Sequence, residues 1–218
     1  MVEAITLWGI GTPRTFRPLW ALEELGVEYQ LRAIGPRTGE TQTEDYAART
    51  AKRKVPLLEV GELRLSESLA MTRHLIATHL HDDVWRPQTA TERAREDEWC
   101  CHIYGELDET SLYIMRRHGE LSAIYGEAPA AVAGAKAYAE HHLALIADML
   151  DGRATLMDGF GLADIMLVSC LDWARFYQLT MPRALLDYRS GIAARPAYQR
   201  AMRKNYADFP QLEQMIGG

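Results

Sequence analysis

Residues 54–68 constrain the fold more than any other part of this 218-residue sequence. Two short apolar runs, 56–60 and 63–65, are separated only by Gly61-Glu62. Apolar runs joined by a two-residue link of this kind are typical of a β-hairpin with a tight turn. Ser66 follows at once, and serine is a favoured residue at the start of a helix. The segment therefore predicts a hairpin that leads directly into a helix opening at Ser66.

The residues before this hairpin predict a strand, a helix and a second strand. Residues 4–8 are short, apolar and partly β-branched, as in a buried strand. Pro13 suits the first turn of a helix, and apolar side chains then recur at helical spacing up to Gly26, a common helix stop. Residues 27–34 predict the second strand, and a short helix is expected near 43–49. The order β-α-β, loop, β-β-α packs as one mixed sheet with helices on its faces.

The rest of the chain predicts helices. Thr89 with Glu92 fits a capping box that opens a long helix to about Arg117. An alanine-rich helix is expected from Pro129 to Gly152, and further helices open near Gly161, Pro182 and Pro196. We therefore predict an α/β domain over residues 1–80 and an all-helical bundle domain over 88–218.

Charge and composition limit the classes of partner. The net charge of −6 falls entirely on residues 81–218, which argues against nucleic acid as the main partner. A small anionic ligand near the basic run at 49–54 stays possible. No stretch approaches the roughly 18–20 uncharged apolar residues of a membrane span. The first residues include an acid and no basic segment, unlike a secretory signal, and three cysteines cannot all pair. We expect a cytoplasmic protein.

Two groups of histidines and cysteines invite a metal interpretation, namely Cys100-Cys101-His102 and His141-His142. Consecutive helical residues point about 100° apart, so neither group can converge on one ion. No metal is predicted. Asp164 stands three residues after Gly161, where its carboxylate can accept first-turn N–H groups, so we assign it a structural role.

The loop between the first strand and the first helix offers one candidate hydroxyl. No serine occurs before Ser66, and no cysteine occurs before Cys100. Thr12 is therefore the residue that could donate a hydrogen bond to a bound thiolate and lower the pKa of that thiol. The alternative is that Thr12 caps the helix, which is a common role of threonine. Both interpretations stay open on the sequence, and Thr15 is expected to matter less than Thr12.

The hairpin resembles that of thioredoxin-type domains, in which a cis proline opens the third strand and the residue before it turns backbone groups toward a peptide ligand. The resemblance implies a cis bond between Val55 and Pro56. The helix that follows would favour a carboxylate at its N-terminus, with a hydroxyl from Ser68 and a counter-charge for an ammonium from Glu67. The plainer alternative is that Pro56 only starts an edge strand and Ser66 only caps a helix.

These segments together resemble the cytosolic glutathione transferase family, in particular members with serine or threonine in the first loop, as in bacteria. The resemblance rests on five motifs: residues 5–8, 17–26, 54–58 with Glu67-Ser68, Gly161 to Ile165, and Arg195 to Tyr198. The sequence departs from the family at Thr12, where serine is usual and one alignment places Pro13 instead. It departs also at Thr50-Ala51, where Asn-Pro is usual, and at Gly161, where serine or threonine is usual.

The resemblance implies a function and a set of contacts. Val55 would pair its backbone with the cysteinyl unit of glutathione, and Glu67 and Ser68 would hold the γ-glutamyl end. Lys54 and Arg14 would lie near the charged groups of the tripeptide. The chain would be a homodimeric enzyme that adds glutathione thiolate to a small hydrophobic electrophile. That second substrate would lie against Cys101, Tyr104 and Asp108. The alternatives are a glutathione-binding protein with little turnover, or a glutathione-dependent isomerase or peroxidase.

Overall fold

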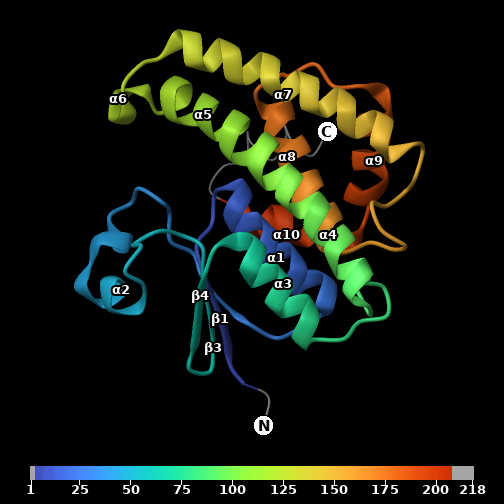
Figure 1. Ribbon diagram of the computed structural model, residues 1–218. Helices are drawn as coiled ribbons and strands as arrows, with labels where there is room; N and C mark the ends of the chain where they lie inside the picture. Colours follow the sequence, from blue (N-terminus) through green and yellow to red (C-terminus); the bar gives the residue numbers. More distant parts are fainter. Residues whose placement is uncertain (1–2, 208–218) are drawn as a thin grey trace. The chain divides into compact units, whose positions relative to one another are not determined.

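The computed structural model describes residues 3–207, which form two compact units. The described part of the first unit comprises residues 3–86 and 194–207, and the second unit comprises 87–193. Figure 1 labels most of the helices and strands in chain order. The elements of the first unit are β1 (Ile5–Trp8), α1 (Pro13–Leu25), β2 (Gln30–Arg32), η1 (Glu40–Gln42), α2 (Glu44–Arg49), β3 (Leu57–Val60), β4 (Leu63–Ser66), α3 (Ser68–Thr78) and α10 (Pro196–Asn205).

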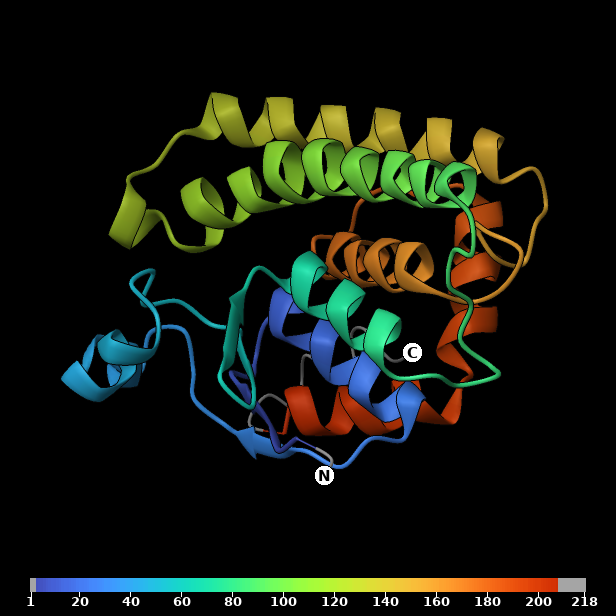
Figure 2. The same cartoon turned by 60° about the horizontal axis from the view of Figure 1, so that its bottom comes forward.

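The four strands form one mixed sheet in the order β2-β1-β3-β4. The β1–β2 pair is parallel, whereas β3 runs antiparallel to both β1 and β4. Leu7 is fully buried, and its neighbour Trp8 points to the opposite face, where its ring meets that of Tyr46 from α2 at 5.8 Å. Helix α1 lies between α3 and α10 in Figure 2. The predicted thioredoxin-like α/β domain is confirmed.

Two element boundaries differ from the prediction. The second strand covers only Gln30–Arg32 rather than 27–34. Helix α3 begins at Ser68 and not at Ser66, because Ser66 still pairs with Leu57 as the last residue of β4. Glu67 separates the two elements with a φ of 79°, a left-handed value that neither a strand nor a helix continues through.

Helix α10 packs on α1, although the whole second unit lies between them in sequence. The ring of Tyr198 stands edge-on to Phe16 at 5.4 Å and to Trp20 at 5.0 Å. Arg195 adds a two-pronged ion pair with Glu24, with both N–O distances below 3.0 Å. The division into domains at 1–80 and 88–218 stays a prediction. The aromatic packing on α1, however, places α10 in the first unit with the sheet.

A buried carboxylate ties the other end of α10 to α1. Glu23 accepts hydrogen bonds from Arg200 Nε at 2.7 Å, from Lys204 Nζ at 2.5 Å and from the Tyr29 hydroxyl. Burial by itself would raise the pKa of Glu23, but the hydrogen bonds from Lys204, Tyr29 and Arg200 outweigh burial and hold this pKa below its ordinary value. Glu23 is therefore ionised at neutral pH and helps to fix α10 on α1.

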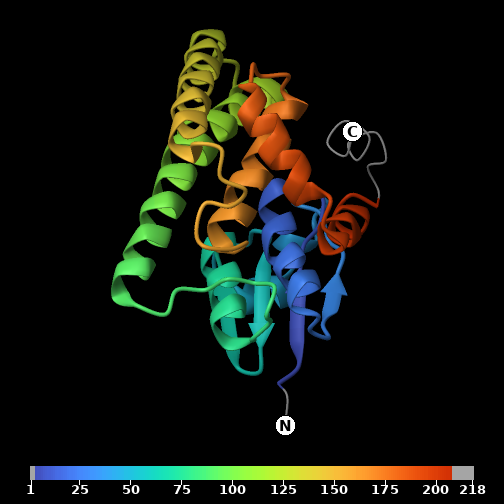
Figure 3. The same ribbon diagram turned by 90° about the vertical axis from the view of Figure 1, so that its right-hand side faces the viewer.

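All the regular secondary structure of residues 87–193 is helical, which confirms the predicted helical domain. Thr89 and Glu92 form the expected capping box, and helical conformation then continues through residue 120. Helix α7 runs alongside this long segment in Figures 2 and 3. The elements are α4 (Ala90–His102), η2 (Ile103–Leu112), α5 (Tyr113–Met115), η3 (Arg116–Glu120), α6 (Ser122–Tyr125), α7 (Pro129–Leu150), α8 (Leu162–Phe176) and α9 (Arg183–Ala193). Elements η2 and η3 are π-helical.

Asp164 has the structural role expected from its position after Gly161. Its carboxylate accepts the backbone N–H of Gly161 at 2.9 Å and that of Leu156 at 2.8 Å. It also accepts the hydroxyl of Tyr188 from α9, and Asp164 itself is fully buried. One side chain thus joins the start of α8, the loop before it and α9. Within residues 3–207, no helix combines the length and apolar character needed to cross a membrane.

Candidate functional site

Three chain segments meet at one edge of the sheet. Trp8 pairs with Leu57, and Leu57 pairs with Ser66, so the three residues form one row across β1, β3 and β4. Because β3 runs antiparallel to both neighbours, the residues after Trp8, before Leu57 and after Ser66 all leave the sheet at the same edge. The loop with Thr12, the Val55–Pro56 bond and the start of α3 are therefore brought together.

Gly9 allows two of these segments to approach closely. A Cβ atom added at Gly9 would lie 2.6 Å from Val55 Cβ and 2.9 Å from Thr15 Cγ2. Gly9 also has a φ of 117°, which side chains rarely permit. The approach of Val55 to the first loop thus requires glycine at this position.

The Val55–Pro56 bond is cis, as predicted. Val55 is half-buried and Lys54 is exposed. The hydroxyl of Tyr46, from α2, donates to the carbonyl of Lys54 at 2.9 Å and holds this segment from behind. Burial, together with the negative charge of Glu59, raises the pKa of Tyr46 to about 12, so the hydroxyl stays protonated as the donor.

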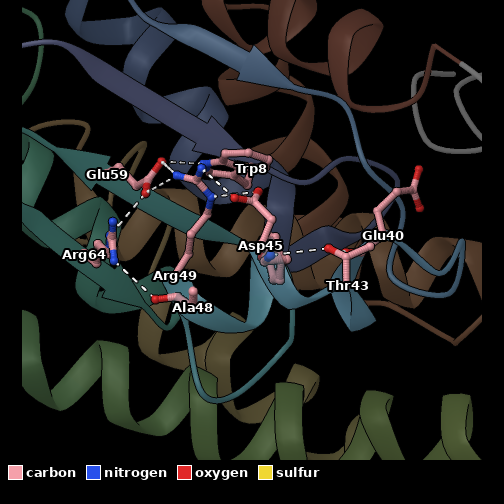
Figure 4. A network of polar contacts seen from close by, with 9 residues as sticks. Trp8, Glu40, Thr43, Asp45, Ala48, Arg49, Glu59 and Arg64 are labelled. Carbon is pink, nitrogen blue, oxygen red and sulfur yellow. Dashed lines mark hydrogen bonds and ion pairs between the residues drawn. The ribbon is translucent and has the colours of Figure 1, made fainter.

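A charged network fixes α2 against the sheet (Figure 4). Glu59 accepts the Trp8 indole N–H at 2.7 Å and pairs with Arg49 at 3.1 Å and Arg64 at 3.3 Å. Arg49 also pairs with Asp45 and lies 4.8 Å over the Trp8 ring. Arg49, the first member of the basic run at 49–54, is therefore held by Asp45 and Glu59, and an anionic ligand near the run stays a prediction.

Glu67 and Ser68 stand at the beginning of α3. Glu67 is exposed and forms an ion pair with Lys52 at 2.6 Å. Ser68 is buried, and its Oγ accepts a hydrogen bond from Arg17 Nη1 at 3.3 Å. Glu67 provides no side-chain cap for α3. Sequence reasoning did not assign Arg17, which is completely buried beside this helix start, to the candidate site.

Thr12 is the N-cap of α1 and is buried. Its Oγ1 accepts the backbone N–H of Thr15 at 3.0 Å, while Thr15 Oγ1 accepts the N–H of Thr12 in return. The two hydroxyl oxygens are also 3.0 Å apart. The capping interpretation is therefore correct, and it uses a lone pair of Thr12. Because the single hydroxyl proton of Thr15 goes to Asn205 Oδ1 or to the Thr12 carbonyl, the Thr12 hydroxyl donates to Thr15 Oγ1 and must leave that acceptor to donate to a ligand. The expectation that Thr15 matters less does not fit this reciprocal pair.

Sequence reasoning also missed Asn205, the last residue of α10. Its side-chain oxygen accepts the Thr15 hydroxyl at 2.8 Å, and its amide nitrogen donates to the Thr12 carbonyl at 3.1 Å. The spacing of Thr12 and Thr15 resembles a capping box and could have drawn attention to Thr15. No comparable local signal points to Asn205, which lies 190 residues from Thr15.

The remaining candidates are one residue of the first unit and three of the second. Arg14 is half-buried in the first turn of α1. Cys101, Tyr104 and Asp108 belong to the second unit. Cys101 is exposed, Tyr104 donates to Glu109 at 3.1 Å, and Asp108 is completely buried. The roles of Arg14, Cys101 and Tyr104 stay predictions. In residues 3–207, no group of three His, Cys, Asp or Glu side chains is arranged to hold a metal ion.

The first part of the chain matches a protein-family model. The model is described as "Glutathione S-transferase, N-terminal domain" and matches residues 3–77. This range contains all four strands and the three segments that meet at the edge of the sheet.

Two curated relatives extend the comparison. Glutathione S-transferase 4 of Zea mays is 42% identical over 72 residues, which are 33% of this chain and 32% of that protein. Glutathione S-transferase theta-1 of Homo sapiens is 25% identical over 147 residues, which are 66% of this chain and 61% of that protein. The matched region thus spans less than two thirds of each relative.

A solved structure is similar over most of the chain. It is a theta class glutathione S-transferase from the citrus canker pathogen Xanthomonas axonopodis pv. citri with glutathione bound. The sequence identity is 27%, the TM-score is 0.76, and the match covers 91% of this chain and 97% of that one. Residues 3–77 thus match the N-terminal domain of glutathione S-transferases, and the chain as a whole is similar in fold to a theta class member of that family.

Proposed function

We propose that the chain binds glutathione at the edge of its sheet and transfers the glutathione thiolate to a small hydrophobic electrophile. The observation that carries this proposal is the pairing of Trp8 with Leu57 and of Leu57 with Ser66. That pairing brings together the loop that carries the Thr12 hydroxyl, the backbone at the cis Val55–Pro56 bond and a helix start without a side-chain cap. A tripeptide needs these three elements: a thiol contact, a backbone partner and a carboxylate site.

The binding contacts follow from the chemistry of each segment. The N–H and C=O of Val55 would pair with the cysteinyl unit. The first N–H groups of α3 and the Ser68 hydroxyl would receive the γ-glutamyl carboxylate, because helix starts favour anions. Glu67 would hold the ammonium after exchanging its exposed ion pair with Lys52, which is weak in water. Lys54 and Arg14 would lie near the remaining charges of the tripeptide.

The proposed reaction begins with the thiolate of bound glutathione, held beside the Thr12 hydroxyl. Donation from the Thr12 hydroxyl lowers the pKa of the bound thiol, and the thiolate is the nucleophile. We propose that Cys101 and Tyr104 contact the electrophile and that glutathione is the co-substrate, with no metal. The contact expected of Asp108 is not proposed, because this side chain is completely buried. The protein is proposed to act in the cytoplasm as a homodimer, on the resemblance to the family.

A second candidate is a glutathione-binding protein with little turnover. The Thr12 hydroxyl already has a partner oxygen in Thr15 at 3.0 Å, and that contact competes with donation to sulfur. A glutathione-dependent isomerase or peroxidase would use the same tripeptide site.

Binding and turnover measured together test the proposal. We expect the protein to be retained on immobilised glutathione and released by the soluble tripeptide. We also expect conjugation with at least one member of a panel of aryl halides, epoxides and activated alkenes. Retention without turnover on this panel or on peroxides and isomerisable substrates would favour the binding protein. Failure to bind glutathione at all would reject both.

Replacing Ser68 with Ala should weaken glutathione binding about tenfold. A hydrogen bond to a charged group contributes about 1.5–3 kcal/mol. The lower end applies because the backbone N–H groups of α3 would still hold the carboxylate. Titration calorimetry measures the change, and exposed Ser190→Ala is the matched control. Unchanged affinity in folded Ser68→Ala would mean that the γ-glutamyl end binds elsewhere.

A further inference from the structure

We propose that Asn205 is a positioning residue for the thiolate, acting from α10 through the loop that carries Thr12. This inference rests on the proposed function of Thr12. Asn205 is the chain's single asparagine, and it is completely buried at the end of α10. None of the proposed glutathione contacts involves Asn205 itself.

Asn205 makes three hydrogen bonds to the first loop and the first turn of α1. Its backbone carbonyl accepts the N–H of Gly11 at 2.8 Å. Its amide nitrogen donates to the Thr12 carbonyl at 3.1 Å, and its amide oxygen accepts the Thr15 hydroxyl at 2.8 Å. The Thr12 carbonyl lies at the same 2.8 Å from the Thr15 hydroxyl and shares its single proton with Asn205. These bonds reach the residue before Thr12, Thr12 itself and the capping partner of Thr12.

We call these three hydrogen bonds of Asn205 the clamp. The clamp holds both the backbone of Thr12 and the residue that orients its side chain, Thr15. The backbone of Thr12 is held by the amide of Asn205. The side chain of Thr12 is oriented by the N–H of Thr15, whose own hydroxyl is anchored on Asn205. Donors that stabilise a developing anion are effective when they are held in place before the anion forms. Asn205 therefore supplies part of the order that the Thr12 donor needs.

Helix α10 is itself firmly attached, so the clamp has a rigid base. Tyr198 packs against Phe16 and Trp20, and Glu23 binds both Arg200 and Lys204. Helix α1 thus holds α10 along its length, and the end of α10 in turn holds the loop in front of α1. The loop position depends on both helices.

The test measures how the bound thiol titrates, by ultraviolet absorbance of the thiolate at saturating glutathione. Asn205→Ala should raise the pKa of the bound thiol by about one unit and lower kcat several-fold, with a smaller change in glutathione affinity. Thr15→Val should act in the same direction, because it removes the hydroxyl that Asn205 anchors. Arg203→Ala, an exposed change on the same helix, should leave the titration unchanged.

The double variant distinguishes positioning from general stabilisation. If Asn205 acts through Thr12, Asn205→Ala should raise the thiol pKa no further in a Thr12→Val background. Equal rises in both backgrounds, or an unmoved titration in folded Asn205→Ala, would overturn the clamp. If Asn205→Ala does not fold, Asn205→Leu keeps the volume, removes both the donor and the acceptor without adding a charge, and gives the same decision.

The wild-type titration separates this inference from the proposed function. A wild-type thiol that titrates like glutathione in water would reject Thr12 as the activating group, and the clamp with it. A lowered wild-type pKa that rises in Thr12→Val but not in Asn205→Ala or Thr15→Val would reject the clamp alone.

Discussion

Replacing Asp164 with Ala is expected to lower the free energy of unfolding by about 3–5 kcal/mol. The carboxylate accepts two backbone N–H groups, from Leu156 and Gly161, and the Tyr188 hydroxyl. All three donors would lose their partner inside the second unit, and each unpaired buried group costs about 1–3 kcal/mol. Urea unfolding followed by circular dichroism measures the loss, and it should appear as a lower midpoint.

Two further variants test the hydrogen-bond account of Asp164. Asp164→Asn keeps one acceptor oxygen but turns an N–H₂ group toward a backbone donor, so its loss should be smaller than that of alanine. Asp148→Ala changes an exposed aspartate on α7 and should stay within about 0.5 kcal/mol of wild type. If Asp164→Ala unfolded at the wild-type midpoint, the carboxylate would not hold the α8 start and α9 together.

Local patterns were sufficient for the order of strands and helices. Alternation, proline position and glycine stops depend on neighbours in sequence, so they predicted α1 up to Gly26 and the hairpin after Pro56. The capping box at Thr89 was visible for the same reason. The predicted start of α3 was wrong because one residue, Glu67, adopts an unusual backbone conformation with a φ of 79°. A serine beside it cannot reveal that conformation.

Contacts between distant segments were outside the reach of the sequence. The apolar face of α10 indicates that the helix packs on something, but it does not identify α1 as the partner. Asn205 reaches Thr15 across 190 residues, and nothing in its neighbourhood predicts this bond. The Lys52–Glu67 ion pair was equally unpredictable, since both residues belong to segments that only the sheet register brings together. The site was thus predictable by segment and not by its supporting residues.

Replacing Thr12 with Val should raise the pKa of bound glutathione by about one to two units. Valine keeps the shape of threonine and removes the donor. A hydrogen bond to a charged group contributes about 1.5–3 kcal/mol, and one pKa unit corresponds to about 1.4 kcal/mol. The neutral thiol becomes favoured up to a higher pH, so conjugation near pH 7 should fall about 10–100-fold while glutathione affinity changes little. Thiolate absorbance and steady-state kinetics across pH measure both effects.

The controls must separate donation to sulfur from the loss of a helix cap, because Thr12 serves as the N-cap of α1. Thr89→Val makes the same change at a capping box of the second unit, so it should cost about 1 kcal/mol of stability without moving the thiol titration. Thr12→Ser keeps the hydroxyl and should keep most of the activity. If Thr12→Val titrates like wild type, the activating group is another donor, and Arg14 and the backbone N–H groups of the loop are the next candidates. If Thr12→Val and Thr12→Ser both lose turnover while binding is kept, then the threonine methyl matters as well as the donor.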